Sequence, residues 1–110
     1  MKVAVPTLNG ELCMHFGHCQ QFILIDIEDE KIKNVESATP PPHAPGVLPA
    51  WLHEQGANVI IASGMGMRAQ NLFRQNGIEV VVGAPVSSPE EIVKQYVSGT
   101  LEAGDNVCDH

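Results

Sequence analysis

Hydrophobic and polar positions follow two different periods along this chain, and the change between them divides the sequence into two parts. In the first part, apolar runs at 2–6 and 21–27 and a two-residue alternation at 31–36 predict three β-strands. The polar segment 28–30 is short enough to join the last two strands as a hairpin. Because alternate positions of 31–36 are polar, we expect this strand at an edge of the sheet.

In the second part, the apolar period becomes that of a helix. Residues 46–55 and 65–76 each carry one apolar stripe and are followed by a glycine, which predicts two helices. The continuous apolar runs at 58–62 and 79–82 predict strands that are covered on both faces.

A third helix has the clearest local boundaries in the chain. Ser88 is suited to cap it, Pro89 fits the first helical position, and Glu91 completes a capping box. An apolar stripe follows, and Gly99 ends the helix.

The order β-β-β-α-β-α-β-α predicts an α/β fold. Right-handed crossovers place helices on both faces of a mixed, five-stranded sheet. We expect one domain over residues 1–101 and a flexible, acidic tail over 102–110. In sheets of this kind, ligands bind at the carboxyl ends of the strands.

Charge and composition narrow the range of partners. The 110 residues carry a net charge of −7, which disfavours binding to nucleic acids or to an anionic membrane surface. No apolar run approaches the roughly 20 residues that span a bilayer, so we expect a cytoplasmic protein. In that compartment its three cysteines should remain thiols.

Candidate metal ligands are concentrated in one short loop and in the tail. Thiolates and imidazoles bind zinc, copper and iron–sulfur clusters. The candidates are Cys13, His15, His18 and Cys19 in the loop, and Cys108 and His110 in the tail. The alternative is a tight turn in which a cysteine is buried as a small hydrophobic residue.

A second candidate site is the glycine turn that joins the strand at 58–62 to the following helix. Gly64 and Gly66 free backbone amides to face an anion, and Arg68 supplies positive charge. Met65 is either core filler or a soft ligand, and His43 of the proline-rich loop reaches the same edge if that loop folds over it. The alternative is a turn that needs glycine only for its backbone geometry.

No pair of carboxylates or nucleophile motif indicates catalysis. The interpretations left open are a carrier of a metal–sulfur cluster, a mononuclear zinc or copper protein, a thiol enzyme, and a small-anion sensor. They differ in whether they need the thiols, the tail or only the glycine turn.

Three segments together resemble the dinitrogenase iron–molybdenum cofactor biosynthesis family. They are His15-Phe16-Gly17-His18-Cys19, Gly64-Met65-Gly66 with Arg68-Ala69, and Tyr96-Val97-Ser98-Gly99-Thr100-Leu101. The resemblance implies a ribonuclease H-like fold without the nuclease carboxylates. It also implies non-enzymatic carriage of an iron–sulfur, iron–molybdenum or related cluster between donor and acceptor proteins.

The same resemblance places His15, Cys19 and the 64–66 turn near the cluster. Cys13 and the Cys108–His110 tail are not part of the shared motif. We expect the protein to be a monomer or a weak homodimer.

Overall fold

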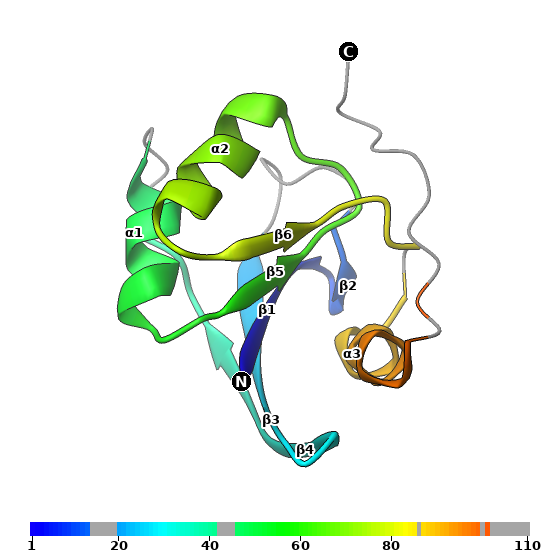
Figure 1. Cartoon of the computed structure of the whole chain (residues 1–110). Coiled ribbons are helices and arrows are strands. Elements are labelled where there is room, and N and C mark those ends of the chain that lie inside the picture. The colour runs from blue at the N-terminus through cyan, green and yellow to red at the C-terminus, as the bar shows by residue number, and fades with distance from the viewer. Residues whose placement is uncertain (14–19, 42–45, 86, 100, 102–110) are drawn as a thin grey trace.

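A computed structural model of the chain describes residues 1–13, 20–41, 46–85, 87–99 and 101 (Figure 1). In chain order, its elements are β1 (Lys2–Leu8), β2 (Glu11–Leu12), β3 (Gln21–Glu28), β4 (Lys31–Ala38), α1 (Val47–Glu54), β5 (Val59–Ile61), α2 (Met67–Gln75), β6 (Glu79–Val81) and α3 (Pro89–Ser98). The strands and helices follow one another as predicted, except that an additional short strand, β2, follows β1. None of the helices in the described residues has the length and apolar character needed to cross a membrane.

The strands form one mixed sheet whose main path runs β4-β3-β1-β5-β6. The central strand, β1, pairs antiparallel with β3 and parallel with β5, and β5 pairs parallel with β6. β4 pairs antiparallel with β3 and lies at one end of this path, so the predicted edge position is confirmed. The α/β class and the mixed character of the sheet are confirmed as well.

The sheet has six strands rather than the five expected, because the chain folds back on β1 and adds β2. Asn9 (φ 55°) and Gly10 (φ 85°) form a two-residue turn, after which Glu11 pairs with Leu8. An Asn-Gly pair favours such a hairpin, since both central positions require positive φ. The sequence pattern did not predict β2, because a strand of two residues is too short to show an alternation of apolar and polar positions.

Two hydrophobic cores lie on opposite faces of the sheet, and the two-residue period of each strand assigns its side chains to one or the other. On β1, Ala4 faces the core under α1 and α2, whereas Val3 and Val5 face the core under α3. Phe73 of α2 and Ile92 of α3 are both almost completely buried. Helices therefore cover both faces, as the sequence predicted (Figure 1).

Helix α3 begins and ends where its local signals indicate. The Ser88 side chain accepts a hydrogen bond from the backbone N–H of Glu91 at 3.4 Å, and Pro89 is the first helical residue. Gly99 closes the helix in the left-handed conformation, with φ 76°. The carboxylate of Glu91 accepts a hydrogen bond from Gln95 one turn later.

The hairpin between β3 and β4 is confirmed, and its turn places two acidic residues in the left-handed region. Glu28 pairs with Lys31, so the turn consists of Asp29 (φ 53°) and Glu30 (φ 62°). A non-glycine residue in this conformation costs roughly 1–2 kcal/mol. Unlike the turn between β1 and β2, this one has no glycine to relieve the strain.

Glu30→Gly is expected to raise the free energy of unfolding by about 0.5–1 kcal/mol, because the relief of strain exceeds the added entropy of the unfolded chain. Urea denaturation followed by Trp51 fluorescence measures the change. The control, Glu28→Gly, removes a side chain from a paired strand position and should lower stability. A Glu30→Gly protein less stable than the wild type would contradict the strain assignment.

Candidate functional site

The carboxyl ends of four strands lie at one edge of the sheet. Strands β1, β5 and β6 are parallel to one another. β4 runs in the same direction as β1, because both are antiparallel to β3. The internal loops in which the sequence predicts ligands are attached at this edge, which we call the carboxyl edge.

Both ends of the loop 14–19 are bonded to consecutive residues at the end of β1. The backbone N–H of Cys13 donates to the Pro6 carbonyl at 2.9 Å, and that of Gln20 donates to the Thr7 carbonyl at 2.8 Å. The positions where this loop leaves and rejoins the sheet are therefore fixed by β1. His15, His18 and Cys19 themselves lie outside the described residues.

Cys13 lies directly after β2 and has only 2% of its surface exposed. A cysteine in such surroundings behaves as a small hydrophobic residue, in line with the alternative considered for one cysteine of this loop. Its role as a metal ligand stays a prediction. It would require the thiol to become accessible.

Polar side chains join the stem of the loop 14–19 to the stem of the proline-rich loop. The Thr7 hydroxyl donates to the Gln21 carbonyl at 3.0 Å. The Gln21 side chain donates to the Thr39 hydroxyl and accepts from the Ser37 hydroxyl, both at 2.9 Å. These bonds tie the start of β3 to the end of β4, from which the chain continues into the segment 42–45. His43 lies outside the described residues.

The glycine turn leaves β5 at the same edge and leads into α2. Met65 is fully buried among the core side chains under α1 and α2, so only its backbone remains for a ligand at this turn. Gly66 is extended (φ −66°, ψ 156°) and acts as the N-cap, which is why α2 begins at Met67 and not at residue 65. Arg68 is exposed in the first turn of the helix, as its predicted role requires.

The two helices that follow β5 and β6 have different N-termini. α3 has the Ser88 cap and the acidic residues Glu90 and Glu91 in its first turn. α2 has no side-chain cap and no acidic residue in its first turn. Its first N–H groups and the positive end of its dipole are therefore compatible with an external anion.

Three polar residues that organise this edge were not predicted from the sequence: Thr7, Gln21 and Gln70. Thr7 and Gln70 are almost completely buried. Gln70 donates a hydrogen bond to the Met65 carbonyl at 2.8 Å. The sequence signal for the burial of Gln70 was its position three residues before Phe73, because residues at this spacing lie on the same face of a helix.

Within the described residues, no three His, Cys, Asp or Glu side chains lie close enough together to hold a metal ion. Of the predicted metal ligands, only Cys13 belongs to those residues. Cys108 and His110 of the tail lie outside them, as do the ligands of the loop 14–19.

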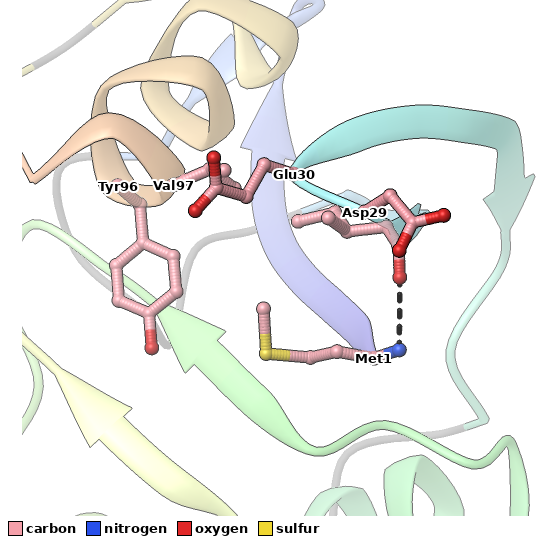
Figure 2. Close-up of a pocket in the computed structure, with 6 residues that line it drawn as sticks. Met1, Asp29, Glu30, Tyr96 and Val97 are labelled. Carbon is pink, nitrogen blue, oxygen red and sulfur yellow. Dashed lines mark hydrogen bonds between the residues drawn. The ribbon is translucent and has the colours of Figure 1, made fainter.

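A separate hollow of about 500 Å³ lies at the opposite edge of the sheet (Figure 2). It is lined by Met1, Ile27, Asp29, Glu30, Tyr96 and Val97, none of which is a predicted ligand. The Tyr96 hydroxyl donates to the Glu79 carboxylate at 3.3 Å. Burial raises the pKa of Tyr96 above its ordinary value, and the charge and hydrogen bond of Glu79 raise it further.

Fold and site together define a small α/β protein whose candidate ligand loops are attached at one edge of the sheet. Residues 1–99 match the model of the family described as dinitrogenase iron-molybdenum cofactor, and the chain belongs to this family. The resemblance noted in the sequence is thereby confirmed.

Individual proteins are similar to this chain in sequence or in structure. The Methanocaldococcus jannaschii protein MJ0580 is 37% identical over 107 residues, which are 93% of this chain and 90% of that protein. The crystal structure of PH0822 is 33% identical, covers 94% of each chain and has a TM-score of 0.87. The apo form of the orange protein from Desulfovibrio gigas shares the fold, with a TM-score of 0.75 at 20% identity over 96% of this chain and 93% of that one.

Tyr96 is the single tyrosine of the sequence, so its ionisation can be measured directly. We expect the ultraviolet absorbance of tyrosinate to titrate above the ordinary tyrosine pKa of about 10. Glu79→Gln should move the midpoint part of the way back, since burial remains while the charge is removed. Because the pKa of Tyr96 is raised in the folded protein, the stability gained from this contact is present below the ordinary tyrosine pKa. That stability is lost as the pH rises through the raised pKa. An ordinary midpoint in the wild-type protein would contradict the assignment.

Proposed function

We propose that this protein is a small, non-enzymatic carrier or scaffold for a metal–sulfur cluster of the iron–sulfur, iron–molybdenum or a related type. The observation that carries the proposal is that the stem of the Cys- and His-containing loop and the N-terminus of α2, which has no side-chain cap, both lie at the carboxyl edge. Membership of the cofactor family supports a cluster as the cargo rather than a single zinc or copper ion.

The two parts of this edge suit different parts of such a cargo. Cys19 and His15 are the first candidates to bind its metal atoms, followed by His18 and Cys13, because thiolates and imidazoles are the ligands that such metals prefer. A sulfide-rich cluster is anionic. Backbone amides at the start of α2 and the exposed Arg68 would therefore stabilise it by electrostatic attraction.

A carrier must also release its cargo. Ligands on a loop whose two ends are fixed to β1 would allow the cluster to be bound and exchanged without unfolding the sheet. We therefore propose cluster donor and acceptor proteins as partners. A cytoplasmic location and a monomeric or weakly dimeric state are separate parts of the proposal. We also propose that the sheet is of the ribonuclease H-like type, which its strand order and directions support.

The test is anaerobic reconstitution with ferrous iron and inorganic sulfide, with and without molybdate. Metal and sulfide are then assayed and a visible spectrum is recorded. The wild-type protein should retain metal and sulfide in a fixed ratio and show charge-transfer bands. Cys19→Ser should lose most of the retained cluster while its thermal unfolding stays close to that of the wild type.

Cys13→Ala compares the second thiol of this segment with that of Cys19. The Cys13 side chain is buried, so the substitution should lower the free energy of unfolding by about 1 kcal/mol, and it should lower metal and sulfide retention less than Cys19→Ser does, because Cys13 is the later candidate as a ligand. Wild-type retention in Cys19→Ser, or no retained sulfide in the wild-type protein, would refute the proposed function.

A small-anion sensor is the second candidate function, and it is favoured by the start of α2, which has no side-chain cap and no acidic residue in its first turn. Such a sensor should bind inorganic phosphate or molybdate equally well when Cys13, Cys19 and Cys108 are all replaced by serine. Arg68→Gln should weaken this binding, as measured by titration calorimetry. A cluster carrier should instead lose its bound cluster when these cysteines are replaced.

A further inference from the structure

Gln70 is a polar residue in the interior, in the second turn of α2. Its side chain has 4% of its surface exposed and lies beside the core under α1 and α2. Burying an amide is unfavourable unless its hydrogen-bonding groups are satisfied. A glutamine at this position therefore indicates a specific partner.

The partners of Gln70 belong to the glycine turn and to the next turn of the helix. Its side-chain amide donates to the Met65 carbonyl at 2.8 Å, and its side-chain oxygen accepts from Arg74 at 3.3 Å. Its backbone N–H donates to the Gly66 carbonyl at 3.1 Å. One residue thus holds two consecutive carbonyls of the turn, one through its side chain and one through its main chain.

Holding these carbonyls also sets the direction of two amides. In a planar trans peptide, the C=O of one residue and the N–H of the next point in opposite directions. The described residues contain no cis peptide bond. The N–H of Gly66 therefore points away from the Gln70 side chain, and the N–H of Met67 points away from the Gln70 backbone.

We propose that Gln70 is a positioning residue that aims the Gly66 and Met67 amides at the bound anion. The proposal rests on the proposed function, because the anion is the sulfide-rich cluster. It assigns the task of fixing the turn to a buried side chain of α2, not to the glycines alone. Without the Gln70 amide, the Met65 carbonyl loses the hydrogen bond that fixes its direction relative to α2.

The main variant is Gln70→Met, which keeps the length of the side chain and removes its donor. The matched control is Gln75→Met, which makes the same change at an exposed position of the same helix. If Gln70→Met does not fold, Gln70→Glu replaces it. A carboxylate keeps an oxygen for Arg74 but has no donor for the Met65 carbonyl.

Amide hydrogen exchange tests the positioning in the cluster-free protein. The Gly83 N–H donates to the Ser63 carbonyl at 2.8 Å, next to the turn, whereas the Glu79 N–H donates to the Asn58 carbonyl at 3.0 Å at the far end of the same strand pair. In Gln70→Met, the Gly83 amide should exchange about tenfold faster while the Glu79 amide keeps its wild-type rate. Equal Gly83 rates in Gln70→Met and Gln75→Met would overturn the proposal.

The bound state supplies a readout that loss of stability alone would not change. After reconstitution with ferrous iron and sulfide, Gln70→Met should release iron to a chelator about tenfold faster than Gln75→Met, and its charge-transfer bands should shift in position. If Gln70→Met shows faster Gly83 exchange but releases iron at the wild-type rate and has an unshifted spectrum, Gln70 does not position the amides for the cluster, and that part of the proposal is overturned. If the wild-type protein takes up no cluster, the proposed function fails, and the Gly83 exchange still decides whether Gln70 fixes the turn.

Discussion

The structure depends on one constraint, which is that β1 is buried on both faces and hydrogen-bonded along both edges. Val3, Ala4 and Val5 are each completely buried. Because consecutive side chains of a strand point to opposite faces, these three residues contribute to both cores at once. Antiparallel pairing to β3 on one side and parallel pairing to β5 on the other then fix the directions of the remaining strands.

The same strand organises the carboxyl edge. Pro6 and Thr7 accept the hydrogen bonds from both ends of the loop 14–19, so backbone hydrogen bonds join the loop stems directly to the core strand. Polar groups at this edge are bonded to neighbouring loops, and among the described residues no buried side-chain nitrogen or oxygen lacks a partner. Satisfied polar groups can hold loops in place without apolar side chains closing the edge, which suits a site that must stay accessible.

Electrostatics distinguish this edge from the rest of an acidic protein. The chain has a net charge of −7, yet the first turn of α2 has no acidic residue and carries the exposed Arg68. Near this helix start, the backbone dipoles and the guanidinium act in the same direction. An anionic cargo would therefore meet local attraction there, while the acidic surroundings limit non-specific binding of other polyanions.

The structural features that the sequence determined by itself are those that depend on residues close together in the chain. The β3–β4 hairpin and both ends of α3 follow from a short polar segment between two strand patterns, a cap and a terminal glycine, all of which act over a few residues. The candidate ligand loops were also predictable, because Cys and His are recognisable by type. The tertiary structure alone decided that Cys13 is buried, that Gln21 joins two loop stems, and that Gln70 holds the Met65 carbonyl. The burial of a side chain and its contacts with other loops or turns depend on which segments of the chain pack together. No local pattern of side chains encodes this packing.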